Sequence, residues 1–378
     1  MGNNINIIGK NLYCIYMEEL RVKVGILTSG GDCQALNSAM YGLVKGLCNM
    51  SKEQVEIFGI LEGYTGLIEG KYKKMKAEEF QDILNMGGTI LGSSRQPFKW
   101  IQEPDDKGRD KVKSMIDNYK KMQLDCLVVL GGNGSHKTAN LLSENGLNVI
   151  TLPKTIDNDI HGTDMTFGYA SAIDIAAKYI DDIRTTARSH KRIFVVEIMG
   201  NKAGWLTLNA GIASGCDVII IPEIPYDVEK IVKFVNKKIE NGKKEIIIAV
   251  AEGVKTKEES KLSKKELKAI REQSTATSSM RLENQLRGKV HGEVRSAVIG
   301  HIQRGGNPSA YDRILSSTLG VKAAELIVNK DYGKVAVLRN GKIKDVPLKE
   351  VAGKKKVVGN EDEIIVQAKA LGICFGDE

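Results

Sequence analysis

The sequence predicts an α/β fold with two βαβ Rossmann-like lobes and mainly parallel sheets. Three observations lead to this prediction. Short β-branched runs alternate with helical patterns along the chain. Glycine-rich turns follow two of these runs, at points where a strand would lead into a helix. The length of 378 residues also exceeds the roughly 250–300 residues that a single core usually organises.

Two strand–turn–helix units are the clearest elements of the chain. In each, a β-branched run ends in a glycine-rich turn, and a helical pattern follows. The first unit consists of Val22–Thr28, Ser29–Asp32 and Leu36–Cys48. The second consists of Leu124–Leu130, Gly131–Ser135 and His136–Ser143, and further strands are expected at Asn148–Leu152, Ile193–Ile198, Asp217–Ile221, Glu245–Val250, Val294–Ile299 and Lys334–Leu338.

Four other segments are predicted from charge and turn chemistry. Arg109–Lys121 and Lys255–Thr277 are highly charged and are expected to be solvated helices with ion pairs four residues apart. Arg339–Gly341 is expected to be a hairpin turn, and Lys354–Val358 a surface loop.

Residues 1–20 are expected to be an N-terminal extension without fixed structure. This stretch lacks the basic region followed by a long apolar run that marks a signal peptide. Met17 would be a normal start ahead of the first strand, so translation could begin at Met1 or at Met17.

Composition excludes several classes of function. No apolar stretch approaches the roughly 18 residues that cross a bilayer, so no membrane association is expected. The net charge of +8 favours anionic partners, but only 13 of the 55 basic residues are arginine and aromatic residues do not alternate with them, which argues against nucleic acid. The six cysteines form no Cys-x-x-Cys pair, and the five histidines are dispersed, which is typical of reduced cytoplasmic proteins without zinc.

Polar clusters follow six of the predicted strands directly. In open α/β sheets, ligands bind beyond the carboxyl ends of the strands. This edge of the sheets is therefore the predicted functional face, and its clusters are Gly30–Asp32, Gly131–Ser135, Lys154–Asp159, Met199–Asn201, Glu252 and His301–Gly306.

The two glycine-rich turns, Gly30–Asp32 and Gly131–Ser135, favour phosphate binding. Neither contains the lysine of a Walker P-loop. Glycines after a strand nevertheless let backbone amides approach a phosphate, and the helix N-terminus behind them favours negative charge. A tight strand-to-helix turn would also explain a single such motif, but two in one chain make phosphate binding the better interpretation.

The segment Pro153–Asp159 contains the best candidate for a catalytic base. A carboxylate at a strand end can accept a proton from an attacking hydroxyl or hold a magnesium ion. An Asx-rich turn is the alternative explanation of Asp-Asn-Asp. Cationic side chains elsewhere in the chain could bind phosphates, and together with a carboxylate base they favour phosphoryl transfer to a phosphorylated alcohol. These side chains are Arg95, Arg192, Arg295, His301 and Arg304.

These motifs together resemble the 6-phosphofructokinase family. The resemblance rests on Val24–Asp32, Gly131–Ser135, Thr155–Asp159, Met199-Gly200 and Gly300–Gly306, and it extends in order from about Val22 to beyond Arg313. Thr-Ile-Asp-Asn-Asp and Gly-His-Ile-Gln-Arg-Gly-Gly are very specific signatures of that family.

The resemblance implies a glycolytic kinase that transfers the γ-phosphoryl group of ATP to the 1-hydroxyl of fructose 6-phosphate, with Mg²⁺ as cofactor. It implies that Asp157 is the base and that Thr155 lies beside it. Fructose 6-phosphate would be held by Thr155, Ile156, Asp157, Arg192, Met199, Gly200, Asn201, Glu252, Arg295, His301, Ile302, Gln303 and Arg304. ATP would be held by Gly31, Arg95, Gln96, Gly132, Asn133, Gly134 and Ser135.

It further implies a donor lobe formed by residues 21–168 and 303–353 and a fructose 6-phosphate lobe formed by residues 169–302 and 354–378. The active site would lie in the cleft between them. Arg192 and Arg295 resemble arginines that reach the sugar phosphate of a neighbouring subunit, which implies a homodimer or homotetramer with shared active sites.

Three departures from the family pattern concern the metal, the transferring phosphate and regulation. Asn133 stands where a magnesium-coordinating carboxylate is usual, so Asn133 and Asp159 are the candidate metal ligands. Asn201 replaces an arginine of many bacterial members, with Lys202 adjacent. Tyr41 and Lys45 replace effector-site arginines, which puts control by ADP or phosphoenolpyruvate in doubt.

Two positions bear on the phosphoryl donor. Gly134 is typical of ATP users, because an aspartate there would crowd and repel the α-phosphate of the nucleotide. Lys154 is typical of pyrophosphate users, because an amine neutralises that donor. Steric exclusion is the harder constraint, since a lysine side chain can swing aside, so ATP is the predicted donor and pyrophosphate the alternative.

Two other functions compete with this one. A non-catalytic sugar-phosphate sensor on the same fold should have lost the base, yet Asp157, Arg192 and Arg304 are all present. A lipid or NAD kinase would share the Gly-Gly-x-Gly turn but would not explain Gly300–Gly306.

Overall fold

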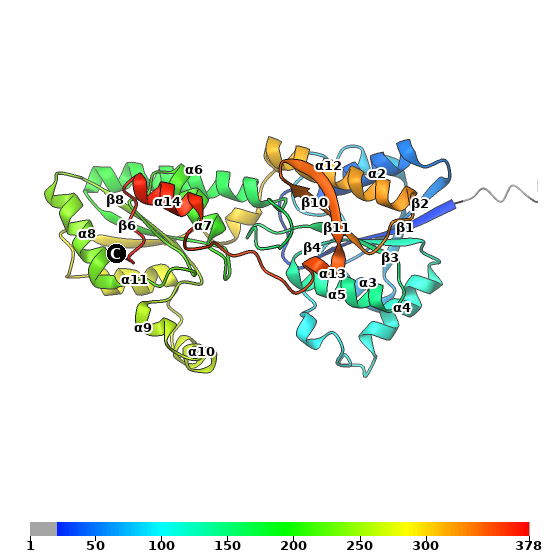
Figure 1. Cartoon of the computed structure of the whole chain (residues 1–378), viewed down its shortest axis with the longest axis horizontal. Helices are drawn as coiled ribbons and strands as arrows, with labels where there is room; N and C mark the ends of the chain where they lie inside the picture. Colours follow the sequence, from blue (N-terminus) through cyan, green and yellow to red (C-terminus); the bar gives the residue numbers. More distant parts are fainter. Residues whose placement is uncertain (1–20, 378) are drawn as a thin grey trace, which may run out of the picture. The chain divides into compact units, whose positions relative to one another are not determined.

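The computed structural model describes residues 21–377, so the predicted extension 1–20 lies outside the described residues. The chain divides into two compact units (Figure 1). Among the described residues, unit 1 comprises 21–32, 36–153 and 315–353, and unit 2 comprises 33–35, 154–314 and 354–377. The lobes predicted from the sequence are defined by the substrate that each one binds. The predicted division into a donor lobe and a fructose 6-phosphate lobe therefore stays a prediction.

Unit 1 is built on a seven-stranded sheet in the order β11-β10-β5-β4-β1-β2-β3. The five inner strands are parallel, and the two edge strands are antiparallel to their neighbours. β4 is buried along its whole length, as expected for a parallel strand that is covered on both faces. The strands are β1 (Arg21–Ser29), β2 (Gln54–Ile60), β3 (Tyr72–Met75), β4 (Cys126–Gly131), β5 (Val149–Pro153), β10 (Lys334–Arg339) and β11 (Lys342–Pro347).

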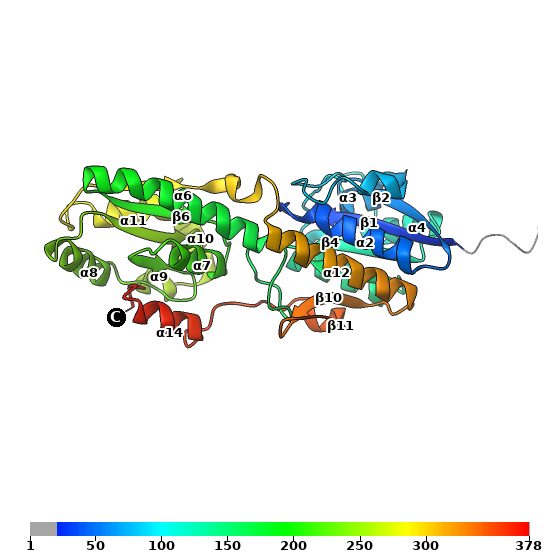
Figure 2. The same ribbon diagram turned by 90° about the horizontal axis from the view of Figure 1, so that it is seen from above.

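Two helices of unit 1, α2 (Leu36–Met50) and the part of α12 (Ala310–Val328) that follows residue 314, pack at very short range. They lie side by side in both views (Figures 1 and 2). A Cβ atom at Gly42 would lie 2.0 Å from the carbonyl oxygen of Ser317. Only glycine permits this approach. The other helices of unit 1 are α3 (Tyr64–Glu69), α4 (Lys111–Lys121), α5 (Asn133–Glu144), α13 (Leu348–Val351) and the 3₁₀ turns η1 (Ala77–Phe80) and η2 (Phe98–Trp100).

Unit 2 contains a four-stranded, wholly parallel sheet in the order β7-β8-β6-β9. Its strands are β6 (Ile193–Ile198), β7 (Val218–Ile220), β8 (Ile246–Ala251) and β9 (Val294–Val298). In Figure 1, α6 lies above these strands and α11 below them. The helices are α6 (Tyr169–His190), α7 (Trp205–Ala213), α8 (Val228–Glu240), α9 (Lys257–Ser260), α10 (Lys264–Glu272), α11 (Ser278–Leu286), α14 (Glu363–Ala370) and the 3₁₀ turn η3 (Gly300–Arg304).

One face of this sheet forms an apolar core with α8 and α11. Side chains that alternate along the strands, such as Ile246 and Ile248, are fully buried, as are Ile231 on α8 and Leu282 on α11. This pattern is the one that parallel βαβ units produce.

The N-terminus of α6 is held by a buried carboxylate that the sequence analysis did not identify. Asp312 is fully buried and accepts hydrogen bonds from Gly168 N at 3.0 Å and from Ser171 N at 2.8 Å. Negative charge is stabilising at a helix N-terminus. Asp312 therefore connects the segment after η3 to the start of the longest helix of unit 2.

The predicted α/β fold with mainly parallel sheets is confirmed. The helix expected over Arg109–Lys121 is present as α4, which begins at Lys111, and Arg339–Gly341 is the turn between β10 and β11. The prediction of one charged helix over Lys255–Thr277 was wrong, because the segment folds into α9 and α10. Thr256 and Ser263 each cap a new helix through a capping box. Within residues 21–377, no helix combines the length and the apolar character needed to span a bilayer.

Candidate active site

Three of the predicted polar clusters lie at the carboxyl ends of neighbouring strands in unit 2. Met199–Asn201 follows β6, Glu252 follows β8, and Gly300–Arg304 follows β9. Because β6 lies between β8 and β9, these clusters share one edge of the sheet. The three clusters predicted for unit 2 therefore lie together at one edge of its sheet, and their function at this edge stays a prediction.

The loop after β6 is bound directly to Glu252. Asn201 N donates a hydrogen bond to Glu252 Oε1 at 2.5 Å. Asn201 has a φ of 53° and Gly200 a φ of 148°, so the loop turns sharply at this point. The backbone at Gly253 approaches the backbone of this loop closely, since a Cβ atom at Gly253 would lie only 2.1 Å from the carbonyl oxygen of Asn201. Glu252 thus holds the shape of this loop, whatever else it binds.

Gln303 connects the loop after β9 to the loop after β6. Its side chain is fully buried; Oε1 accepts a hydrogen bond from Met199 N at 3.3 Å, and Nε2 donates to Gly300 O at 3.0 Å. Gln34 Nε2 donates to the carbonyl oxygen of Gln303 at 2.8 Å. The amide of Gln303 is therefore engaged with the protein, whereas His301 is exposed, Ile302 is 63% exposed and Arg304 is half-buried.

The turn Thr155–Asp159, which carries the predicted base, is fixed by its own hydrogen bonds. Asp157 N donates to Thr155 Oγ1 at 3.1 Å, and Thr166 Oγ1 donates to Thr155 O at 2.7 Å. Asn158 has a φ of 50°, and its Oδ1 accepts a hydrogen bond from Thr166 N at 3.1 Å. Ile156 is fully buried beneath the turn. Asp157 and Thr155 are half-buried side chains of an ordered turn.

The surroundings of Asp157 raise the pKa of its carboxyl group from 3.8 to about 6. Burial is the largest cause, because it disfavours the charged form, and the negative charges of Asp159 and Glu252 act in the same direction. Arg304 and Lys154 oppose them. This carboxylate is ionised at neutral pH and is a stronger base than an ordinary aspartate, which suits proton abstraction.

Lys154 and Asp159 flank Asp157, and both are buried. Lys154 is 3% exposed and pairs with Phe167 in an isolated β-bridge. Asp159 is 6% exposed, and its Oδ2 lies 3.3 Å from Lys355 Nζ. The charges of Lys154, Asp157 and Asp159 are thus close enough to influence one another.

The C-terminal segment around Lys356, expected to be a surface loop, lies against this turn. Lys355 pairs with Ile160 in an antiparallel bridge, and Lys356 N donates to Asp159 O at 2.9 Å. Val358 is 2% exposed, and its N–H donates to Glu223 Oε1 at 3.1 Å. The expectation of a surface loop was therefore wrong for Lys356 and Val358, because both are held by contacts with distant residues.

Arg192, which directly precedes β6, and Arg295 on β9 lie together because β6 and β9 are neighbouring strands. Arg192 Nε donates to Glu293 Oε2 at 2.5 Å, and Arg295 Nη2 donates to Glu293 Oε1. The Arg295 side chain is 51% exposed. One carboxylate therefore orients two guanidinium groups, and sequence reasoning did not identify Glu293.

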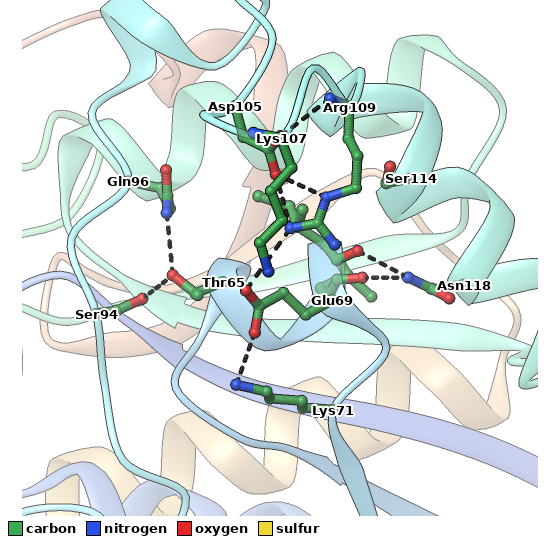
Figure 3. A network of polar contacts seen from close by, with 12 residues as sticks. Thr65, Glu69, Lys71, Ser94, Gln96, Asp105, Lys107, Arg109, Ser114 and Asn118 are labelled. Carbon is green, nitrogen blue, oxygen red and sulfur yellow. Dashed lines mark hydrogen bonds and ion pairs between the residues drawn. The ribbon is translucent and has the colours of Figure 1, made fainter.

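In unit 1, the first glycine-rich turn is bound to the segment that carries Arg95. Gly30 has a φ of 86°, and its N–H donates to Ser94 O at 3.0 Å. Gln96 Nε2 donates to Thr65 Oγ1 at 3.0 Å, and Thr65 Oγ1 lies 2.7 Å from Ser94 Oγ (Figure 3). The predicted donor residues Gly31, Arg95 and Gln96 are thus brought to one place.

The second glycine-rich turn, at the end of β4, leads directly into α5. Gly132 precedes the helix, and Asn133, Gly134 and Ser135 form its first turn, whose N–H groups can bind an anion. A Cβ at Gly131 would lie 2.2 Å from Ser135 Cβ, whereas a Cβ at Gly134 would meet no atom within 4 Å. The fold therefore requires glycine at 131 and leaves open space at 134.

The residues predicted to bind metal do not form a complete protein site. Among residues 21–377, no group of three or more His, Cys, Asp or Glu side chains could hold a metal ion. Asp159 supplies a carboxylate and Asn133 an amide oxygen, and both are ligand types that Mg²⁺ accepts. Each residue taken by itself therefore fits Mg²⁺ as a single ligand, and its role as a metal ligand stays a prediction.

Comparisons with known proteins identify the same family over most of the chain. Residues 23–327 match phosphofructokinase. An ATP-dependent 6-phosphofructokinase of Spirochaeta thermophila is 50% identical, over 93% of this chain and 97% of the relative. ATP-dependent 6-phosphofructokinase 3 of Bacteroides thetaiotaomicron is 40% identical, over 94% of this chain and 100% of the relative.

Solved structures show the same fold. Pichia pastoris phosphofructokinase in the T-state superposes with a TM-score of 0.75 at 29% identity, over 93% of this chain and 37% of that one. A pyrophosphate-dependent phosphofructokinase from Nitrosospira multiformis superposes with a TM-score of 0.76 at 20% identity, over 93% of this chain and 90% of that one. At 20% identity, the similarity to the Nitrosospira multiformis structure concerns the fold alone.

Proposed function

The chain belongs to the phosphofructokinase family, and we propose that it transfers the γ-phosphoryl group of ATP to the 1-hydroxyl of fructose 6-phosphate with Asp157 as the base. It is an ATP-dependent 6-phosphofructokinase, a glycolytic phosphotransferase that acts on an alcohol group. This confirms the family and the activity expected from the sequence. The roles of individual residues are our proposal.

The raised pKa of Asp157 is the observation that supports its role most strongly. Its ionised carboxylate accepts the proton of the 1-hydroxyl while the hydroxyl oxygen forms its bond to the γ-phosphorus. The bond from that phosphorus to the bridging β–γ oxygen breaks, and ADP leaves with the bonding electrons. A base with a pKa of about 6 is ionised at neutral pH and still has appreciable proton affinity.

Fructose 6-phosphate binds, in this account, at the carboxyl edge of the unit 2 sheet. Arg304 and His301 belong to the segment after β9, and Glu252 shapes the neighbouring loop Met199–Asn201. Cationic groups there would neutralise the sugar phosphate. Arg192 and Arg295 would add two guanidinium groups to the 6-phosphate of a neighbouring subunit in a homodimer or homotetramer.

The phosphates of ATP bind, in this account, at the two glycine-rich turns of unit 1. The first turn of α5 offers backbone N–H groups, and Arg95 lies in the segment bound to Gly30. The open space at Gly134 would be filled by the nucleotide.

Mg²⁺ would arrive with the ATP phosphates and would be held there by few protein groups, as is usual for this ion. Asp159 and Asn133 are the candidates, and the bound ion would supply charge neutralisation on the donor. The cytoplasmic location expected from the sequence stays a prediction.

The test of the activity is direct identification of the product. Purified protein is incubated with fructose 6-phosphate and MgATP, and the sugar is analysed by ³¹P NMR. Fructose 1,6-bisphosphate with one ADP for each bisphosphate supports the proposal. Turnover with pyrophosphate but none with ATP would reverse the donor assignment that Lys154 had left open.

A further inference from the structure

Lys356 reaches the turn that carries the catalytic base from nearly 200 residues away in the sequence. Its ammonium group donates three hydrogen bonds: to Asn158 Oδ1 at 3.0 Å, to Thr163 O at 3.0 Å and to Asp164 O at 2.7 Å. An ammonium group has three donors, so all of them are used on this one segment. The arrangement is that of a built internal contact and not of a solvated surface lysine.

We propose that Lys356 is a positioning residue for phosphoryl transfer, whose ammonium group holds Asn158 and thereby fixes the turn in the conformation that presents Asp157 to the acceptor hydroxyl. This inference rests on the proposed function. Lys356 touches no substrate in this account and acts through Asn158.

The turn needs such support because Asn158 has a φ of 50°. A residue other than glycine in this region carries strain of order 1 kcal/mol or more, which surrounding contacts must offset. The bonds from Lys356 Nζ and Thr166 N to Asn158 Oδ1 are those contacts. Without the ammonium group, the turn would have fewer bonds to oppose a change at Asn158, which directly follows Asp157.

Lys356 also connects this turn to the loop that shapes the proposed sugar site. Trp205 begins α7, four residues after Asn201, and its Nε1 donates to the carbonyl oxygen of Lys356 at 3.3 Å. The ammonium nitrogen lies 5.5 Å from the centroid of the Trp205 ring, within cation–π range. Lys356 thus relates the position of the base to the segment that follows Met199–Asn201.

The first experiment is steady-state kinetics of Lys356→Met, which removes the three donors but keeps an apolar stem over Trp205. We expect kcat to fall roughly 10–100-fold while KM for fructose 6-phosphate changes less than about threefold, because a misplaced base slows the chemical step without removing sugar contacts. Lys356→Arg keeps the charge and should recover part of kcat. Lys354→Met, at an exposed lysine two residues earlier, is the matched control and should behave like the wild type.

A double-mutant cycle with Asn158→Gly tests the route of the effect. Glycine tolerates the positive φ but removes the acceptor of Lys356. If Lys356 acts through Asn158, the double variant should be no slower than the slower single variant. An unchanged kcat in Lys356→Met, or losses in kcat that multiply in the double variant, would overturn the proposal.

Two other results must be interpreted: a Lys356→Met variant that does not fold, and a wild-type protein that is inactive. If Lys356→Met does not fold, Asn158→Gly decides alone: a lowered kcat with unchanged KM supports the proposal, and a wild-type kcat overturns it. If the wild-type protein does not phosphorylate fructose 6-phosphate with MgATP, the proposed function has failed, whereas an active wild type with an unaffected Lys356→Met contradicts only the role of Lys356.

Discussion

Arg192 Nε donates a hydrogen bond to Glu293 Oε2 at 2.5 Å, and the same carboxylate binds Arg295 through its other oxygen. Two guanidinium groups are therefore held side by side although nearby like charges repel. A dianionic phosphate could bind both groups at once. This relationship supports the proposal, which came from the family resemblance, that both arginines bind the sugar phosphate.

Arg192→Ala and Arg295→Ala should each raise KM for fructose 6-phosphate roughly 10–100-fold with little change in kcat. Each loses a charge-assisted hydrogen bond of about 1.5–3 kcal/mol, and about 1.4 kcal/mol corresponds to a factor of ten. Steady-state kinetics with saturating MgATP measures the effect. An unchanged KM in both variants would remove them from the site.

The same arginines test whether active sites are shared between subunits. Arg192→Ala and Asp157→Asn chains are co-expressed with different tags, purified as hybrids and assayed at a fructose 6-phosphate concentration near the wild-type KM, where both parent variants are slow. The hybrids should be clearly faster than either parent, because one active site then contains neither defect. Hybrids no faster than the Arg192→Ala parent would show that Arg192 serves its own subunit or none.

The pH dependence of kcat/KM should follow the ionisation of Asp157 in the free enzyme. Its carboxylate must be deprotonated to act as a base, so kcat/KM should fall as pH decreases through about 6. An aspartate with an ordinary pKa would keep the enzyme active to much lower pH. Rates measured between about pH 5 and pH 8, with protein stability checked at each point, distinguish the two cases. A flat profile across pH 6 would contradict the role of Asp157 as base.

Asp157→Asn should stabilise the protein at neutral pH while it lowers activity. The folded state raises the pKa of Asp157 from 3.8 to about 6, so the folded state binds this proton more tightly than the unfolded state does. Stability from this group is therefore present at low pH and is lost as pH rises from about 4 to about 6. The asparagine variant avoids that loss, which is about 1–3 kcal/mol at neutral pH.

The stability difference between Asp157→Asn and the wild type should accordingly grow as pH rises through this window. Denaturant unfolding at several pH values measures the difference, and comparison with the wild type at each pH cancels the titration of other groups. A difference that is constant with pH would mean that the carboxyl pKa is not raised on folding.

Gly134→Asp should fold normally but lose turnover with ATP. A Cβ at this position meets no protein atom within 4 Å, so a side chain is tolerated by the fold and would instead occupy space proposed for the nucleotide. We expect KM for ATP to rise at least about tenfold, because repulsion between the new carboxylate and the nucleotide phosphate should cost about 1.4 kcal/mol or more, and about 1.4 kcal/mol corresponds to a factor of ten. Gly134→Ala, which adds the methyl group alone, is the control. A Gly134→Asp enzyme with unchanged KM for ATP would place the nucleotide elsewhere.

The gathering of polar clusters at one edge of the unit 2 sheet could be predicted from sequence because it depends only on the order of strands and turns along the chain. Each polar cluster directly follows a β-branched run, so recognising the strands was enough to place Glu252 and Met199–Asn201 at one edge of a sheet. The break at Ser263 could have been found as well, since Ser263 and Glu266 form a capping box that is visible in the sequence.

The supports of the site could not be predicted, because they depend on contacts between distant residues. Lys356 belongs to a run of three lysines, which is typical of solvated surface, and its acceptor Asn158 lies 198 residues earlier. Glu293 likewise gains its role only when β6 and β9 pair. Sequence patterns indicate which chemistry is present, whereas packing determines which side chains hold it in place.

The most direct test of the account is the initial rate of fructose 6-phosphate phosphorylation by wild type and Asp157→Asn, with MgATP and with Mg-pyrophosphate in parallel. We predict rapid turnover with ATP in the wild type and a loss of roughly 10²–10⁴-fold in kcat in Asp157→Asn, with KM for the sugar largely kept. Undiminished ATP-dependent turnover in Asp157→Asn would contradict the assignment of Asp157 as the base.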